Sequence, residues 1–426
     1  MGIKQNLSTP LSWEELSQFV SDDSDRIQGP TNSYALLRLF GQPIENLRVT
    51  FYRDHHAWCP YCQKVWLWLE WKRIPYKVRK VTMRCYGNKE SWYTKKVPSG
   101  MLPALEIDNR LYTESDQILL ELEDTFGPLG TPLTAPRSLE LRSLERKLFQ
   151  AWCVWLCNSA FIQRQENQRK EHFQEVAREM ERQLIVNQEP WLDPVFHSSG
   201  KSFPGSSDVV FIPYLERMNA SLAYYKGLNL REEHPKIGTW FKSLEALEVY
   251  RGTQGDMHTH AHDLPPQMGG CWVNSNTKQK QFSLAIDSGE GLGEFEMSFS
   301  TEQESNSQNP ESVALSRVLK HRQNLIALNP LGSNLFDQPL RAALTLMIKG
   351  EPCLPQEGSA QGLRYLKDRI SVPRDMPLLS ARKFRKALEK TAQLDSSQQG
   401  PAIDTKNRFD QNPMPFIKDS PKSFDQ

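Results

Sequence analysis

The sequence has few cysteines and almost no net charge, and each shortage excludes a class of protein. Seven cysteines in 426 residues are too few for a dense disulfide framework, and their odd number fits a reducing compartment. Lysine and arginine number 52 against 51 aspartates and glutamates, so no charge excess suggests a nucleic-acid partner or an anionic membrane. The sequence also lacks any apolar run near the roughly 20 residues that span a bilayer.

The amino-terminal segment lacks the features of a targeting sequence. It carries acidic residues such as Glu14, Glu15 and Asp22 and has no apolar h-region, which argues against a secretory signal or an Arg-rich transit peptide. We therefore predict a cytoplasmic protein, long enough for two or three domains. Residues 1–45 are expected to be a polar lead-in with one short amphipathic segment at 34–40.

The most specific pattern in the chain is Cys59-Pro60-Tyr61-Cys62, which lies where a strand pattern changes to a helix pattern. Residues 47–52 alternate between apolar and polar types, and an apolar-rich stretch without glycine or proline follows up to Pro75. A cysteine at this junction lies over the unpaired N–H groups of a helix, which stabilise a thiolate. The motif indicates thiol redox chemistry, with half of a zinc site or two structural thiols as alternatives.

Two further motifs stand at element boundaries. Leu102-Pro103 precedes a predicted strand at 104–107, which pairs through an Asp108-Asn109 turn with a strand at 110–113. Glu114-Ser115 precedes a predicted helix that ends at Phe126. Ser115 can cap this helix and bind a carboxylate there, while Glu114 can bind an ammonium group. Taken alone, a proline before a strand is more often an ordinary loop residue, and a serine at this position is more often a plain helix cap.

In their order and spacing these motifs resemble the N-terminal domain of glutathione S-transferases, in particular the cysteine-type (omega-like) members. The Cys-Pro-Tyr-Cys sequence is similar to that of glutaredoxins, and the helical region 138–250 is similar to the family's all-α C-terminal domain. The resemblance covers about 205 of the 426 residues. It implies a thioredoxin-like α/β domain at 46–128 followed by an all-α domain.

The resemblance also implies a role for each motif residue. Cys59 takes the position of the nucleophile that forms a mixed disulfide with glutathione, the co-substrate, and Cys62 could act as a second, resolving thiol. The remaining glutathione contacts that it implies are Lys89, Leu102 (where the family usually has valine), the cis proline Pro103, Glu114 and Ser115. Most omega-like enzymes lack the second cysteine, so Cys62 is a departure from the pattern.

The function that follows from the resemblance is glutathione-dependent thiol transfer on a small-molecule or protein disulfide. Conjugation of glutathione to electrophiles is one alternative, although family members that conjugate generally use serine or tyrosine, whereas a cysteine favours disulfide exchange. A non-catalytic binding module with the same fold is another. The resemblance also allows a homodimer, because family members commonly dimerise through the N-terminal domain.

The remainder of the chain carries no pattern that we assign to a known domain. We expect a His/Gly/Pro-rich connector and polar linker at 251–309, a helical extension at 310–392 and a disordered tail at 393–426. Alternate histidines His258, His260 and His262 would point the same way on an extended segment and, with Cys271, could hold a metal ion. A histidine-rich connector packed on the helical domain is the simpler alternative, and we assign no metal.

Overall fold

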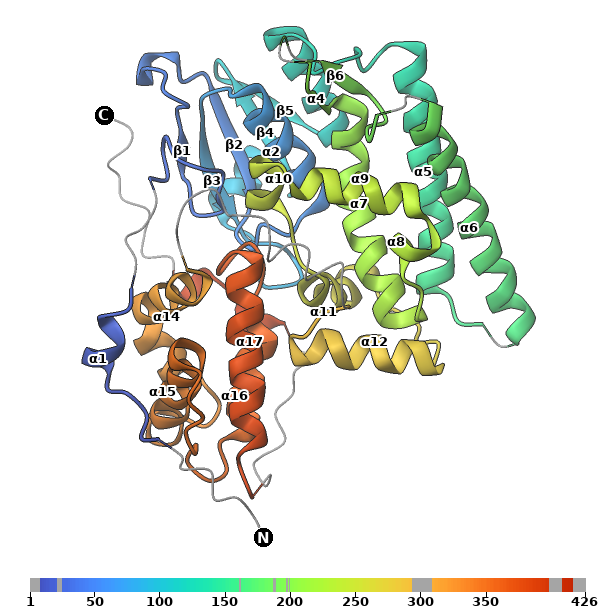
Figure 1. Ribbon diagram of the computed structural model, residues 1–426. Coiled ribbons are helices and arrows are strands. Elements are labelled where there is room, and N and C mark those ends of the chain that lie inside the picture. Colours follow the sequence, from blue (N-terminus) through green and yellow to red (C-terminus); the bar gives the residue numbers. More distant parts are fainter. Residues whose placement is uncertain are drawn as a thin grey trace.

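The amino-terminal half of the protein is built on a five-stranded mixed sheet (Figure 1). The computed structural model describes residues 8–20, 25–160, 162–186, 189–196, 198, 200–292, 309–397 and 408–416. The strand order is β1-β3-β2-β4-β5. The elements of this layer are β1 (Leu37–Arg38), β2 (Val49–Asp54), α2 (Pro60–Lys72), β3 (Tyr76–Val81), α3 (Ser91–Lys96), β4 (Ala104–Ile107), β5 (Arg110–Thr113) and α4 (Ser115–Phe126).

The pairing of the strands is that of a thioredoxin-like domain. β3 runs parallel to β2 after the crossover helix α2, whereas β4 is antiparallel to β2 and β5 is antiparallel to β4. All six residues of β2 are buried, which fits its central place in the sheet. Asp108 and Asn109 form the predicted hairpin turn, with φ angles of 49° and 67°. The segment 34–40, expected in the lead-in, supplies β1.

A helical body packs against this sheet layer. It consists of α5 (Pro136–Cys157), α6 (Gln163–Val186), a small hairpin β6 (Pro194–Phe196) and β7 (Ser202–Pro204), α7 (Ser206–Ser221), the π-turn η2 (Leu222–Lys226), α8 (Leu230–Glu233), α9 (Pro235–Glu245) and α10 (Glu248–Thr253). Helix α7 is buried along its whole length and contacts both α2 and α5. One apolar core therefore continues from the sheet into the helices. The predicted fold class, a thioredoxin-like domain followed by a helical one, is confirmed.

A second helical unit follows with an apolar core of its own (Figure 1). The connector helices α11 (Met257–Met268) and α12 (Thr277–Ser288) come after α10, and the second unit then consists of α14 (Pro310–Ala327), α15 (Ser333–Lys349), α16 (Ala360–Arg369) and α17 (Leu378–Gln393). The short helix α1 (Trp13–Ser17) inserts Leu16, fully buried, into the second core. This contact shows that part of the predicted lead-in is a structural element of the extension.

Two expectations about the carboxyl-terminal part are wrong. The connector contains the helices α11 and α12, because Asp256 and Asn276 cap them and a glycine in the left-handed region ends each one. Part of the predicted disordered tail is ordered: residues 408–416 form the turns η3 (Phe409–Gln411) and η4 (Met414–Phe416). This segment is held by Arg408, which is 4% exposed and pairs with Asp263 at 3.4 Å.

Buried polar contacts join the second unit to the rest of the chain. Arg385 of α17 forms an ion pair with Asp256, the cap residue of α11, and both side chains are almost completely buried. The backbone N–H of Val372 donates to the Thr259 hydroxyl at 3.0 Å. No helix among the described residues is both long enough and apolar enough to cross a membrane.

Candidate functional site

The register of the sheet brings the three sequence motifs to one edge. Strand β2 ends at Asp54, just before Cys59, and Tyr52 lies opposite Ala104, the first residue of β4. Ala104 also lies opposite Thr113, the last residue of β5. The Cys-Pro-Tyr-Cys motif, Leu102-Pro103 and Glu114-Ser115 therefore all leave the sheet at the same edge.

Cys59 is the cap residue of α2, and Pro60 occupies the first helical position. The Cys59 Sγ accepts a hydrogen bond from the backbone N–H of Cys62 at 3.4 Å, as expected for a sulfur placed over a helix N-terminus. The two cysteines are 5% and 2% exposed. Burial, followed by the interaction with Cys59, raises the pKa of Cys62 well above its ordinary value. Cys62 therefore remains a neutral thiol beneath Cys59.

The motif is held by two residues that the sequence analysis did not single out. The Asp54 carboxylate accepts the backbone N–H of Trp58 at 2.6 Å and that of Cys59 at 3.3 Å. The Arg217 guanidinium, from α7, lies 4.7 Å from the Trp58 ring centroid and donates to the Trp58 carbonyl. The loop that carries Cys59 is therefore held between the negative charge of Asp54 and the positive charge of Arg217.

The segment before α3 positions Lys89. Its Nζ donates to the Thr82 carbonyl at 3.1 Å. Burial lowers the pKa of Lys89. Glu90 is the residue before α3, and its carboxylate accepts the Thr82 N–H at 2.9 Å. This hydrogen bond holds the backbone next to Lys89 in place.

The other two motifs differ in how exposed they are. The Leu102–Pro103 peptide bond is cis, Pro103 is buried and Leu102 is half-buried. Glu114, rather than Ser115, is the cap residue of α4, at a φ of 63°. Ser115 is the first helical residue, so its N–H is one of the unpaired donors of that helix. Glu114 is exposed, whereas Ser115 is 6% exposed.

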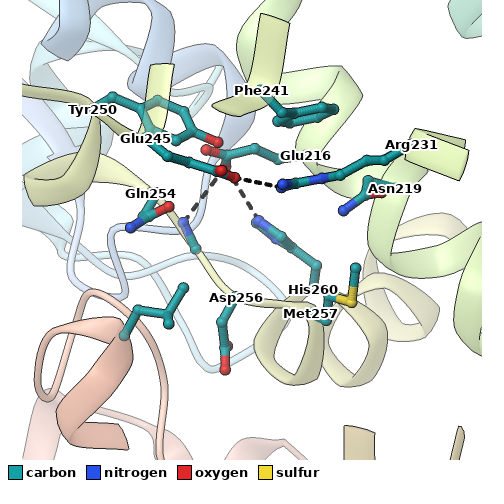
Figure 2. A pocket seen from close by; sticks show the side chains of 12 residues that line it. Glu216, Asn219, Arg231, Phe241, Glu245, Tyr250, Gln254, Asp256, Met257 and His260 are labelled. Carbon is teal, nitrogen blue, oxygen red and sulfur yellow. Dashed lines mark hydrogen bonds and ion pairs between the residues drawn. The ribbon is translucent and has the colours of Figure 1, made fainter. Parts of the chain in front are cut away.

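The three histidines of the connector do not face the same way. They lie on helix α11, where residues two apart point to different sides and residues four apart share a face. Figure 2 shows His260 in a polar pocket, where its Nε2 lies 3.2 Å from Glu216 Oε2. His258 and His262 instead form a cluster with Asp287 of α12. The expectation of three histidines on one extended face is therefore wrong.

Cys271 does not join either histidine group. Among the described residues, the cluster of potential metal ligands around His258 contains no cysteine. Burial raises the pKa of Cys271 to about 12, with Cys157 as the next contribution. Burial also raises the pKa of Cys85 and of Cys153 to about 12. These thiols are poor nucleophiles, in contrast to a cysteine at a helix N-terminus.

Known proteins are similar to this chain in the region that carries the three motifs. Residues 58–125 match the family model "Glutathione S-transferase, N-terminal domain". Glutathione S-transferase DHAR3, chloroplastic, from Arabidopsis thaliana is 24% identical over 204 residues, 46% of this chain and 69% of the relative. Glutathione S-transferase L3 from the same plant is 24% identical over 207 residues, 46% of this chain and 79% of the relative.

A solved dehydroascorbate reductase from Chlamydomonas reinhardtii is also similar, with 20% identity and a TM-score of 0.40. It covers 49% of this chain and 93% of the reductase chain. One relative is named as chloroplastic, so the cytoplasmic location stays a prediction. The edge that gathers Cys59, Pro103 and Ser115 lies inside residues 58–125, the segment that matches the family model of the glutathione S-transferase N-terminal domain.

Proposed function

We propose that the protein is a glutathione-dependent thiol transferase that acts on mixed disulfides through Cys59. The observation that carries this proposal is the position of the Cys59 sulfur at the N-terminus of α2, on the sheet edge where β4 begins and β5 ends. The relatives named glutathione S-transferases support glutathione as the co-substrate.

The same edge provides complementary groups for the parts of glutathione. The N-terminus of α4, with the Ser115 N–H and hydroxyl, suits the γ-glutamyl carboxylate, and the exposed Glu114 carboxylate suits its ammonium group. The backbone of Leu102 is the group that would pair with the cysteinyl part of the tripeptide. Lys89 would contact a further carboxylate. This arrangement directs the glutathione sulfur toward Cys59.

The reaction proceeds by two thiol–disulfide exchanges. The Cys59 thiolate attacks the glutathione sulfur of a glutathionylated substrate, the substrate S–S bond breaks, and the substrate leaves as a thiolate that takes a proton from water. A second glutathione thiolate then attacks the Cys59–glutathione disulfide. Oxidised glutathione leaves and the Cys59 thiolate is restored. The mixed disulfide of the substrate is reduced to a thiol, one free glutathione thiol is oxidised, and both glutathionyl groups leave together as oxidised glutathione.

Cys62 is not required in this cycle. Its buried, neutral thiol would have to lose a proton in a desolvated position before it could displace glutathione from Cys59. A free glutathione thiol in solution does not face this penalty. We therefore propose a monothiol mechanism, with the two-cysteine route as its alternative.

Turnover assays on the full chain test the proposal. Wild type is expected to reduce a glutathionylated cysteine and to show little activity on an aryl halide, and dehydroascorbate belongs in the same panel as a small-molecule oxidant. Cys59→Ser should lose the activity, whereas Cys62→Ser should keep most of it. Aryl-halide conjugation that survives in Cys59→Ser would favour the conjugating alternative. Absence of all turnover would favour a binding module.

A further inference from the structure

The histidines of α11 form a cluster that the thiol chemistry does not use. One ligand atom each of His258, His262 and Asp287 lies within 4.8 Å of the other two. The two histidines are four residues apart on one helix, which places both rings on the same face. Two histidines at this spacing on a helix are a known arrangement for binding zinc. We propose that His258, His262 and Asp287 bind a divalent metal ion of the zinc type.

An orphaned nitrogen supports a ligand at this position. The His258 side chain is 3% exposed, and its Nε2 has no hydrogen-bond partner among the residues that the structure describes. The carboxylate oxygen Oδ1 of Asp368 lies 3.6 Å from this nitrogen, beyond hydrogen-bonding distance. A buried imidazole nitrogen without a partner costs free energy, and a metal ion would use the lone pair of that nitrogen.

The spacing of the atoms suits a tetrahedral ion. Zinc bonds to nitrogen and carboxylate oxygen of about 2.0–2.1 Å place the ligand atoms of a tetrahedron about 3.4 Å apart. His262 Nε2 lies 2.7 Å from Asp287 Oδ1, and His258 Nε2 lies 3.6 Å from Asp368 Oδ1. The ligand atoms of His258, His262 and Asp287 all lie within 4.8 Å of one another, so small side-chain rotations bring the three to a common centre. Asp368 of α16 lies beside His258.

The neighbouring side chains orient the ligands. The Tyr224 hydroxyl donates to Asp287 Oδ2 at 2.9 Å, which leaves Oδ1 directed at His262. The Tyr224 ring also packs edge-on against the His262 ring, with the centroids 5.2 Å apart. Support of this kind, from groups that hold the ligands rather than bind the metal, is a regular part of metal sites. The positive charge of Arg385, which lies near His258, is balanced by its ion pair with Asp256.

The location of the cluster suggests a structural role. The ligands come from α11 and α12, and Asp368 comes from α16 of the second helical unit. An ion bound here would connect that unit to the connector helices. Its removal should therefore lower the thermal stability of the full chain and leave the sheet edge around Cys59 unchanged.

Cobalt titration of the full chain tests this proposal, because Co²⁺ replaces zinc and is visible by absorption. Asp54, Cys59 and Cys62 form a second group of potential ligands, so the titration is done in a Cys59→Ser, Cys62→Ser background. We expect one ion per chain, with d–d bands and without sulfur-to-cobalt charge-transfer bands. His258→Gln, His262→Gln and Asp287→Asn should each abolish that binding, and Tyr224→Phe should weaken it about 10–100-fold.

His260→Gln is the matched control, since His260 is buried on the same helix but faces Glu216. It should bind the ion as the background does, and Zn²⁺ should raise the melting temperature of both. If His258→Gln does not fold, the variants of the part-exposed His262 and Asp287 decide the test. No binding by the background protein, thiolate bands in its spectrum, or unchanged affinity in the ligand variants would each overturn the proposal.

Discussion

Glu90 should stabilise the protein at neutral pH and lose this effect in acid. Burial alone raises the pKa of its carboxyl group, but the His55 imidazole 3.5 Å away and hydrogen bonds from the backbone and hydroxyl of Thr82 outweigh burial and lower it to about 2, from an ordinary value of 4.5. Each pKa unit corresponds to about 1.36 kcal/mol. The ionised carboxylate therefore contributes about 3 kcal/mol to the free energy of unfolding.

The direction of the pH dependence follows from the lowered pKa. The folded protein holds the Glu90 proton more weakly than the unfolded chain does, so the stabilisation is complete above pH 4.5 and disappears as the pH falls toward 2. Glu90→Gln removes the charge and keeps the shape. At pH 7 this variant should be less stable than wild type by about 3 kcal/mol, and the difference should shrink steadily between pH 4.5 and pH 2.5.

Urea unfolding followed by tryptophan fluorescence at several pH values measures the difference. Glu140→Gln is the control, since the Glu140 side chain is 72% exposed and its loss should change the midpoint little at any pH. A difference between wild type and Glu90→Gln that is the same at pH 7 and pH 3 would refute this reasoning. So would a difference below about 1 kcal/mol at pH 7.

Three further substitutions test the glutathione site and the structural core separately. Ser115→Ala removes one hydrogen bond to a charged group and should raise the KM for glutathione about tenfold with kcat nearly unchanged, whereas a fall in kcat alone would contradict its binding role. Arg385→Met leaves the buried Asp256 carboxylate unpaired and should cost about 3–5 kcal/mol in urea unfolding. The exposed Arg182 gives the control Arg182→Met, and an equal effect of the two would contradict the account. Leu363→Ala empties a fully buried position in the second core and should cost about 2–5 kcal/mol without changing thiol transfer, which steady-state kinetics would check.

The sequence predicts the sheet layer well because its signals are local. The alternation around residues 47–52, the Asp108-Asn109 turn and the glycine after Phe126 each fix an element boundary within a few residues. The order of the motifs then predicts which boundaries meet. This part of the fold follows from patterns that act over short stretches of chain.

The contacts that complete the site depend on tertiary structure and give no local signal. Arg217 lies 158 residues after Cys59 in the sequence, yet its guanidinium contacts the carbonyl next to that cysteine. Asp54 had a weak signal, as an acidic residue at the end of a strand directly before the motif. Neither spacing nor composition indicates which helix side chain reaches the loop.

In the connector, amino-acid composition predicts the wrong secondary structure. Histidines, prolines and glycines at 251–273 are typical of a loop, but Asp256 accepts the Thr259 N–H at 2.9 Å and starts a helix there. An Asp-x-x-Thr pattern was the available signal. The secondary structure also decides which histidines lie together. On an extended segment all three would share a face, whereas on the helix His258 and His262 share a face and His260 lies on another.

The most direct test of the central claim is the intact mass of the protein after mixing with oxidised glutathione. Wild type should gain one glutathionyl group, Cys62→Ser should gain the same group, and Cys59→Ser should gain none. The high pKa of Cys85, Cys153 and Cys271, about 12 in each case, keeps these thiols protonated and unmodified. A glutathionyl adduct on Cys59→Ser, or no adduct on wild type, would contradict the account.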